Sequence, residues 1–446
     1  MIDKNASARE LALHILGANA RDKSYIDLAV KAGMSGSSLD RRDRALAARL
    51  CYGVVQNRML LNHYIAQFST IRLKRIHPVV LDILRLGFYQ LIFTDKIPAS
   101  AAVNTTVELT KKSGNVRASG FVNALMRRAS SEKLVPPEGF TPEALSLKYS
   151  HPMWLVNYFI NKIGAEETAE LLSLNNTPAP TTARLNRLKA DMDTLKAQLE
   201  KEHIGIRPHP FLDDCIFLDN TGDLEESAAF NEGLFTVQDA ASQLCVLAAD
   251  AKSSEFVIDA CAAPGGKSFY LSQQMENQGT LFSCDIYDHK VDLIKDGAAR
   301  LGVSNLTAML QDAGEFNEKW NEKADLVLAD LPCSGIGIIR KKPDIRYKNE
   351  DEVSKLPELQ LRLLENLCRY VKPEGRLVYS TCTLMNEENE GVISLFLEKN
   401  PDFYPETFRL PGANAEVRDG MITLWPHIHG TDGFFICRMK RRSRTT

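Results

Sequence analysis

Two cysteines stand where a reactive thiol could do chemistry. Cys333 lies in the turn-forming stretch Asp330-Leu331-Pro332-Cys333-Ser334-Gly335, and Cys382 lies in Ser380-Thr381-Cys382-Thr383. Each stretch follows an apolar run with the character of a β-strand. A thiolate is a strong nucleophile at neutral pH, and a loop near helix N-termini can lower the pKa of a thiol. The two cysteines are therefore candidates for nucleophilic or acid–base chemistry.

The remaining cysteines give no comparable signal. Nine are present, with no Cys-x-x-Cys pair and no histidine at zinc-ligand spacing, so neither a disulfide framework nor a structural metal site is expected. His427 and His429 have no third ligand nearby, and we expect a structured loop there. Small buried hydrophobic positions are predicted for Cys51, Cys215, Cys245, Cys284, Cys368 and Cys437.

A glycine turn between a strand and a helix predicts a cradle for a nucleotide-like cofactor. The apolar run 257–260 leads into Cys261-Ala262-Ala263-Pro264-Gly265-Gly266-Lys267-Ser268, and an apolar helix begins near Phe269. Gly265 and Gly266 permit a tight turn, and the helix N-terminus offers free N–H groups to an anionic group such as a carboxylate. The first glycine of a phosphate-binding Gly-x-x-x-x-Gly-Lys-Ser/Thr loop is missing, which excludes that interpretation.

Acidic residues follow several of the predicted strands. Asp285 lies 26 residues after Asp259, at the spacing of an acid that binds ribose hydroxyls. Asp312 follows the next strand and could reach an adenine edge, and Asp330 precedes Cys333. Since the carboxyl ends of parallel strands meet at one edge of a sheet, we expect these acids and the two cysteines to lie there together.

The elements that must position these side chains read as an α/β domain. The spacing of the candidate strands leaves room for crossover helices and favours a mostly parallel, doubly wound sheet in which the fourth and fifth strands are neighbours. The candidate strands are Phe256–Asp259, Thr280–Asp285, Leu306–Leu310, Asp325–Asp330, Arg376–Ser380 and Phe434–Met439.

The N-terminal part is different in periodicity and in charge. Apolar residues recur at helical spacing, which predicts helices over 78–93, 98–112 and 118–128. Residues 1–135 hold 21 Lys and Arg against 10 Asp and Glu, whereas the rest of the chain holds 33 against 47. The net charge of −3 thus conceals a basic segment that suits a polyanion. The expected domains are an all-helical one at 1–140, a small α/β linker module at 141–235 and a catalytic one at 236–446.

Composition excludes several classes of protein. With 44% apolar and 25% charged residues, the chain is neither disordered nor collagen-like. The first twenty residues lack a continuous apolar stretch, and no run of eighteen apolar residues occurs. We therefore expect no signal peptide, no membrane span and a reducing cytoplasmic location. A monomer is expected.

The motifs together resemble a known family. Asp-Ala-Cys-Ala-Ala-Pro-Gly-Gly-Lys, Asp-Leu-Pro-Cys-Ser-Gly and Ser-Thr-Cys-Thr with Asn386-Glu387-Glu388-Asn389 are similar to the signatures of RNA (cytosine-5)-methyltransferases of the Fmu/Sun group. Ile83–Gln90 and Gly120–Asn123 resemble an RNA-binding domain of NusB type. Arg184-Leu185-Asn186 and 237–242 also match the family, while Ser268 replaces its usual Thr and Leu185 its usual Val.

The resemblance implies a fold and a reaction. The fold would be a Rossmann-like class I methyltransferase domain with a mostly parallel seven-stranded sheet, preceded by an all-α NusB-like domain and a small α/β module. S-adenosylmethionine would be the cofactor and 16S ribosomal RNA the partner. Cys382 would add to cytosine C6, Asp330 would bind near N3, and Cys333 would assist loss of the C5 proton or product release. The cofactor contacts would be Cys261, Ala262, Ala263, Pro264, Gly265, Gly266, Lys267, Asp285, Asp312 and Asp330.

Two alternatives remain open at the level of sequence. A transfer RNA methyltransferase would share the catalytic core, and a non-catalytic RNA-binding or antitermination-like factor would share the helical domain but would leave the paired cysteines unexplained. The basic stretch 340–346, directly after the Cys333 loop, is expected to border the site and to meet RNA phosphates.

Overall fold

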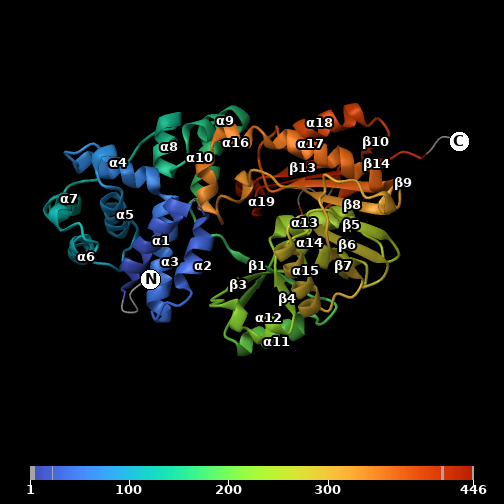
Figure 1. Cartoon of the computed structure of the whole chain (residues 1–446), viewed down its shortest axis with the longest axis horizontal. Helices are drawn as coiled ribbons and strands as arrows, with labels where there is room; N and C mark the ends of the chain where they lie inside the picture. The colour runs from blue at the N-terminus through green and yellow to red at the C-terminus, as the bar shows by residue number, and fades with distance from the viewer. Residues whose placement is uncertain (1–5, 23, 413–415, 444–446) are drawn as a thin grey trace. The chain divides into compact units, whose positions relative to one another are not determined.

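A computed structural model describes residues 6–22, 24–412 and 416–443. Two compact units make up the chain (Figure 1). The helical unit comprises Met1–Pro178 together with Ile339–Lys348, and the sheet unit comprises Ala179–Ile338 together with Asn349–Thr446. A short segment that follows the Cys333 loop in the chain therefore belongs to the helical unit.

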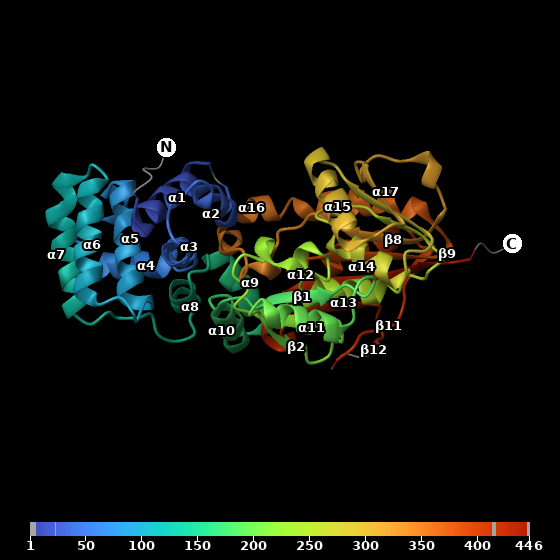
Figure 2. The ribbon, with the colours of Figure 1, turned by 90° about the horizontal axis from the view of Figure 1, so that it is seen from below.

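The helical unit forms because apolar residues recur at helical spacing and bury one stripe of each helix. Leu50, Val54, Leu61 and Ile65 lie in the resulting core. Figure 2 shows α5, α6 and α7 as neighbouring rods, in agreement with the predicted helices. The helices are α1 (Ala8–Asp22), α2 (Ile26–Met34), α3 (Arg41–Gln56), α4 (Arg58–Phe68), α5 (Pro78–Phe93), α6 (Ala99–Lys112), α7 (Ser119–Ser131), α8 (Pro142–Tyr149), α9 (Met153–Ile163) and α10 (Ala165–Leu174).

The sheet unit begins with a small antiparallel sheet in the order β2-β3-β1-β4. Its strands and helices are β1 (Thr181–Leu185), α11 (Met192–Lys201), β2 (Gly205–Pro208), β3 (Cys215–Asp219), α12 (Ala228–Asn231) and β4 (Phe235–Val237). Leu195 and Leu199 of α11 pack against the strands in a core of their own. The division into three domains at 140 and 235 stays a prediction, since α8–α10 belong to the helical unit and the small sheet to the sheet unit.

The large sheet has the order β10-β14-β9-β8-β5-β6-β7. Parallel pairing joins β7, β6, β5, β8 and β9, and β14 is antiparallel to β9. β13 and β10 pair with opposite ends of β14, so eight strands fill seven positions of the expected sheet. The strands are β5 (Phe256–Asp259), β6 (Thr280–Asp285), β7 (Leu306–Leu310), β8 (Ala324–Asp330), β9 (Val371–Thr381), β10 (Phe403–Pro405), β13 (Met421–Leu424) and β14 (Phe434–Arg441).

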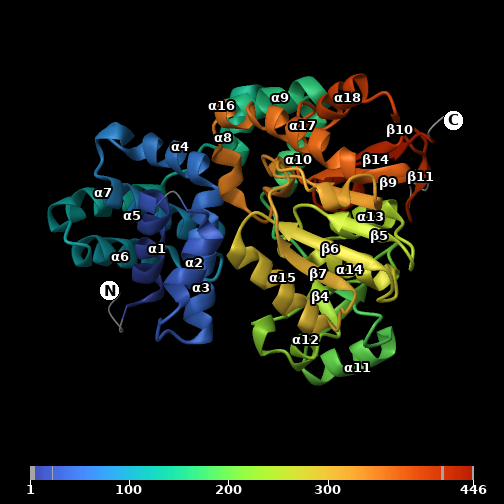
Figure 3. The ribbon, with the colours of Figure 1, turned by 45° about the vertical axis from the view of Figure 1, so that its right-hand side comes forward.

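Helices cover both faces of this sheet because alternate strand residues point to opposite sides. Leu326 and Leu328 pack with α13 and α14, whereas Val327 and Ala329 pack with α17 and α18. Figure 3 shows α14 and α15 beside β6 and β7, and β7 is the edge strand at this end of the sheet. The remaining elements of this unit are α13 (Ala240–Ala249), α14 (Gly266–Gln274), α15 (Asp288–Leu301), α16 (Glu350–Val353), α17 (Leu356–Leu367), α18 (Glu390–Lys399), α19 (Pro426–His429), β11 (Phe408–Arg409) and β12 (Glu416–Val417).

The strand order reverses between β5 and β8. From β5 the chain proceeds outward through β6 and β7, then returns to β8 and continues in the opposite direction through β9. Crevices at the carboxyl ends of strands beside such a reversal are where open α/β sheets bind ligands. This topology places the loops after β5 and β8 next to each other.

Candidate active site

The loop after β5 is shaped by Gly265. Its φ of +108° suits glycine, and a Cβ there would lie 2.2 Å from Cζ of Phe269. Gly265 precedes Gly266, the first residue of α14. The free backbone N–H groups of that helix N-terminus therefore face the loop, as the sequence predicted for an anion-binding turn.

Asp259 accepts a hydrogen bond from the first turn of α14. Ser268 Oγ donates to Asp259 Oδ2 at 2.6 Å, and Ser283 Oγ lies 2.8 Å from Ser268 Oγ. Burial raises the pKa of the Asp259 carboxyl to about 7, because the charged form loses its hydration. A serine in place of the family's usual threonine keeps the hydroxyl that this contact needs.

Unpartnered polar atoms border the loop on another side. Both amide atoms of the buried Gln238 lack a hydrogen-bond partner, and its Nε2 would lie 3.6 Å from a Cβ built on Gly266. Asp259 Oδ1 is likewise buried without a partner. Buried polar groups are normally hydrogen-bonded, so their convergence on this loop fits a polar ligand.

The acid at the end of β6 and the acid after β7 are held by local contacts. Asp285 Oδ1 accepts a hydrogen bond from the Tyr287 backbone N–H at 3.1 Å and has Lys290 Nζ at 3.7 Å. Asp312 Oδ1 accepts from the Gly314 N–H at 2.7 Å. These turns fix both carboxylates at the ends of their strands, on the edge that carries the glycine loop.

Asp330 joins the glycine loop to the cysteine loops. Lys267 Nζ donates to Asp330 Oδ2 at 2.6 Å, and Ser380 Oγ donates to Oδ1 at 2.7 Å. Burial disfavours the charge on Lys267, but the ion pair with Asp330 outweighs burial and raises the pKa of Lys267 above its ordinary value. The carboxylate is thus fixed in position by one residue from each neighbouring segment.

Cys333 and Cys382 meet as the sequence predicts. Their Sγ atoms are 3.2 Å apart, and both residues are free cysteines, half-buried. The hydrogen bond to Cys382 and then burial raise the pKa of the Cys333 thiol well above its ordinary value. β8 and β9 bring the two together because they pair in parallel up to Asp330 and Ser380.

Glu388 holds both cysteine loops, a role that sequence reasoning missed. Its Oε2 accepts from the Ser334 backbone N–H at 2.8 Å and from Gln360 Nε2 at 2.9 Å, while Oε1 accepts from Thr383 Oγ1 at 3.1 Å. Ser334 Oγ and Thr383 Oγ1 are themselves 2.7 Å apart. The fully buried carboxylate therefore fixes the residues that follow each cysteine. Its signal in the sequence was the run Asn386–Asn389, which carried no assigned role.

A close approach of two glycines completes the support of Cys382. Gly337 N–H donates to the Cys382 carbonyl at 3.0 Å, and Gly433 N–H donates to the Gly337 carbonyl at 2.9 Å. A Cβ on Gly337 would lie 2.0 Å from the Gly433 oxygen, so no side chain fits there. The chain beyond Cys333 is thereby tied to the backbone of Cys382.

The remaining cysteines lie where expected. All six assigned to apolar positions are buried, and Cys261 is half-buried in the glycine loop with a pKa raised by burial. Where a structured loop was expected, His427 and His429 lie in the short helix α19, and His429 Nδ1 accepts from the Trp425 N–H at 2.9 Å. Among the described residues, no group of three or more His, Cys, Asp or Glu side chains could hold a metal ion, and no helix is long and apolar enough to cross a membrane.

One member of the basic stretch 340–346 does not fit the expectation of phosphate contacts. Arg346 is fully buried in the helical unit and donates to backbone carbonyls including those of Gln56 at 2.9 Å and Pro343 at 3.1 Å, and to Asn176 Oδ1 at 2.7 Å. Burial lowers its pKa to about 10. The guanidinium stabilises the fold of this segment, because the carbonyls that surround it consume its donors.

Comparisons with known proteins agree with this architecture. Residues 246–440 match the family model described as 16S rRNA methyltransferase RsmB/F, residues 6–131 match the NusB family, and residues 151–225 match a ferredoxin-like domain of RsmF/B-like methyltransferases. The NusB-like helical domain and the methyltransferase domain expected from the sequence are confirmed.

Relatives cover almost the whole chain. A Bacillus subtilis protein named probable ribosomal RNA small subunit methyltransferase B is 37% identical over 98% of this chain and 100% of its own length. A Synechocystis protein with the same name is 34% identical over 98% and 99%. Among solved structures, PH0851 is 25% identical with a TM-score of 0.81 over 98% of this chain and 99% of its own. A methyltransferase homolog from Pyrococcus horikoshii is 28% identical with a TM-score of 0.59 over 68% and 100%.

Proposed function

The chain belongs to the 16S rRNA methyltransferase RsmB/F family, and we propose that it methylates C5 of a specific cytosine in 16S ribosomal RNA through a covalent bond between Cys382 and cytosine C6. The observation that carries this proposal is the pair of thiols 3.2 Å apart. A pair of cysteines beside a fixed carboxylate suits a reaction that needs one sulfur to add and a second group to move a proton.

The glycine loop suits S-adenosylmethionine as the methyl donor. The segment 261–267 would hold the amino-acid part at the N-terminus of α14, Asp285 would bind the ribose hydroxyls, and Asp312 would lie near the adenine. The unpartnered amide of Gln238 supplies a further donor and acceptor beside the loop. When bound, this cofactor supplies an electrophilic methyl group on a sulfonium centre.

Cys382 is the sulfur that adds to the base. Cytosine C5 is a poor nucleophile until a thiolate adds at C6 and turns the ring into an enamine. The raised pKa of Cys333 keeps a proton on that sulfur, so its S–H is placed to donate to Cys382 Sγ and to favour negative charge there.

Asp330 contacts the base near N3, and Cys333 assists the release of the methylated base. Lys267 and Ser380 hold both carboxylate oxygens of Asp330, which presents that group to the N3 side of a cytosine that reaches Cys382. After methyl transfer, C5 must lose its proton and the bond between C6 and Cys382 must break. The C5 proton passes to water, the electrons of the C5–H bond re-form the C5–C6 double bond, and Cys382 leaves as a thiolate. Cys333 assists this release because its S–H is placed to donate a hydrogen bond to the leaving sulfur. The target base enters unpaired or flipped, because a stacked base could not reach sulfurs that are half-buried.

The experiment is methyl transfer from labelled cofactor to purified small-subunit rRNA and to bulk transfer RNA, followed by digestion to nucleosides. We expect 5-methylcytidine from the ribosomal RNA and none above background from transfer RNA. Label in another nucleoside would contradict C5 as the target. Label chiefly in transfer RNA would contradict the ribosomal substrate and favour the alternative weighed from the sequence.

A further inference from the structure

We propose that a pocket in the helical unit binds one unpaired nucleotide of the substrate RNA, at a position other than the target cytosine. This inference rests on the proposed function, because it names how the same substrate is held. The pocket has a volume of about 670 Å³ and is lined by α3, α5, the end of α8, the turn at 176–178 and residues of the 340–343 stretch. A cavity of this size accommodates a nucleotide-sized ligand.

Its charge is one-sided. Among the described residues, four cationic side chains and no carboxylate line it, and the cations are Arg49, Lys148, Arg340 and Lys341. Arg49 and Lys148 are exposed, so their charges are accessible to a ligand from solvent. A pocket with cations and no acid attracts an anion, and the phosphate of an RNA chain is the anion that the proposed substrate carries.

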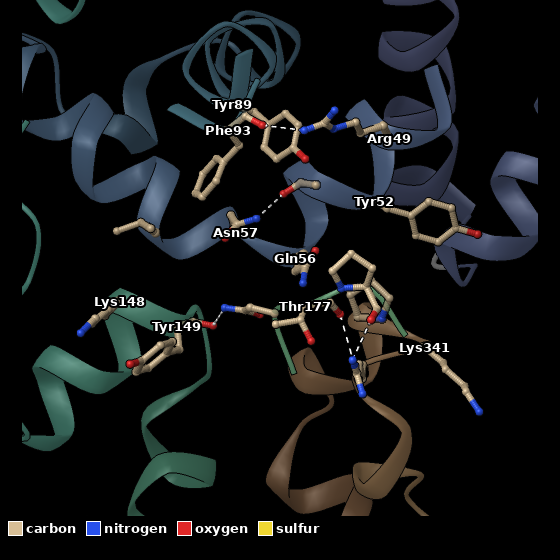
Figure 4. A pocket seen from close by; sticks show the side chains of 16 residues that line it. Arg49, Tyr52, Gln56, Asn57, Tyr89, Phe93, Lys148, Tyr149, Thr177 and Lys341 are labelled. Atoms are coloured by element: carbon tan, nitrogen blue, oxygen red, sulfur yellow. Dashed lines mark hydrogen bonds between the residues drawn. The ribbon is translucent and has the colours of Figure 1, made fainter. Parts of the chain in front are cut away.

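Aromatic rings provide the second part of the chemistry. Tyr52, Tyr89, Phe93 and Tyr149 line the same pocket. Figure 4 shows Tyr89 and Phe93 on one side of it and Tyr149 on the other. Phe93 and Tyr149 are each only half-buried, which leaves ring surface for a base to stack on, whereas the Tyr52 ring points away from them (Figure 4). Unpaired bases are commonly bound by stacking on aromatic side chains, whereas duplex RNA keeps its bases inside the helix.

Tyr89 and Phe93 form an aromatic wall of the pocket on α5, and packing contacts fix the position of this wall. Tyr89 stacks on Phe93 with ring centroids 5.2 Å apart and 27° between the planes. Tyr89 also packs directly on α3 at Gly53, where a Cβ would lie 2.0 Å from Cζ of the ring. Arg49 Nη2 donates to the Phe93 carbonyl at 2.8 Å, which holds one cation at the rim of this wall.

The opposite wall is fixed by polar contacts. Arg340 Nη2 donates to the Pro178 carbonyl at 2.7 Å, and Asn176 Nδ2 donates to the Tyr149 carbonyl at 2.9 Å. Arg346 then donates to Asn176 Oδ1 at 2.7 Å from its buried position behind the wall. The basic stretch singled out in the sequence thus contributes Arg340 and Lys341 to the pocket and Arg346 to its support.

The test compares matched charge removals on the full-length protein. Arg49→Gln with Lys148→Gln removes two cations of the pocket, and Arg72→Gln with Lys133→Gln removes two exposed cations of the same unit outside it. We expect the pocket pair to raise the KM for small-subunit rRNA about 10-fold and the control pair to change it less than about 2-fold. Equal effects of the two pairs would overturn the pocket in favour of a diffuse basic surface.

Stacking is tested with Phe93→Leu and Tyr149→Leu in one protein. Affinity for a fluorescent single-stranded oligouridine should fall at least about 5-fold, while affinity for a duplex of the same length should stay within about 2-fold. Equal losses for both probes, or no loss for the single strand, would overturn the nucleotide assignment. The binding assay needs no catalysis, so a wild-type protein that forms no 5-methylcytidine would refute the proposed function without deciding the pocket.

Discussion

The thiol pair and the nucleotide pocket hold their side chains in opposite ways. Cys333 and Cys382 sit in loops fixed by the fully buried Glu388, whose carboxylate accepts three hydrogen bonds. The pocket instead presents exposed cations such as Arg49 and Lys148. Chemistry needs reacting atoms held within a fraction of an ångström, whereas binding of a flexible polyanion tolerates mobile cations. Substitutions at the thiol site should therefore lower the rate of methyl transfer far more than substitutions in the pocket do.

The largest effect is expected at the nucleophile. Cys382→Ala should lower kcat at least about 1,000-fold, because it removes the sulfur that adds to cytosine C6 and leaves Cys333 with its proton. The control is Cys51→Ala, which changes a buried thiol in the core of the helical unit and should keep activity within about 2-fold. Single-turnover methyl transfer measures both. If Cys382→Ala retained activity, Cys382 would not be the nucleophile, and the thiol pair would be no more sensitive to substitution than the pocket.

A second effect concerns the buried carboxyl under the glycine loop. The pKa of Asp259 is raised to about 7, so the folded state favours its neutral form and loses stability as pH rises from about 4 to 7. Between pH 5 and 8, wild type should lose about 3 kcal/mol of unfolding free energy relative to Asp259→Asn. Urea unfolding at a series of pH values measures this difference. If the unfolding free energies of the two proteins changed with pH in parallel, burial would not raise the pKa of Asp259.

A third effect concerns Glu388, which holds the two cysteine loops in position but takes no part in the reaction itself. Glu388→Ala leaves the Ser334 N–H without its acceptor and frees both cysteine loops, so kcat should fall about 30-fold while the KM for the cofactor stays within about 2-fold. Glu387→Ala is the matched control, because that neighbouring carboxylate is exposed. Activity of Glu388→Ala equal to that of the control would show that the thiol geometry does not depend on this network.

The smallest effect is expected in the nucleotide pocket, as a change in how steeply RNA affinity falls with salt concentration. Loss of two phosphate contacts in Arg49→Gln with Lys148→Gln should reduce the magnitude of the slope of log affinity against log salt by about 1.4, because each phosphate contact of a single strand contributes about 0.7. Fluorescence anisotropy with labelled small-subunit rRNA at several salt concentrations measures this slope. An unchanged slope would mean that these cations meet no phosphate.

The cofactor side of the site could be predicted from the sequence because its signals are local. A strand, a glycine turn and a helix follow one another in 256–274, and the acids stand at strand ends whose edge is set by parallel topology. The meeting of Cys333 with Cys382 followed from the pairing of two strands. These inferences need periodicity and strand order, and no knowledge of side-chain packing.

The supporting contacts could not be predicted because they join distant segments. Ser334 and Glu388 are 54 residues apart, and nothing in either stretch indicates that one carboxylate would hold both loops. The sequence suggests that Arg346 is a solvated or phosphate-binding cation, yet it donates to the carbonyls of Gln56 and Tyr149, which lie 290 and 197 positions away in the chain. Charge alone does not tell a binding arginine from a buried structural one.

The covalent bond between Cys382 and the target base is tested most directly by the Cys333→Ala variant, in which release of the base is expected to fail. Cys333→Ala, incubated with cofactor and small-subunit rRNA and then denatured, should yield a protein–RNA adduct that migrates slowly on a denaturing gel. After nuclease digestion, mass spectrometry should place the nucleotide on the peptide that contains Cys382, and Cys333→Ala with Cys382→Ala should yield no adduct. Absence of the adduct from Cys333→Ala, or its persistence in the double variant, would contradict a covalent intermediate on Cys382.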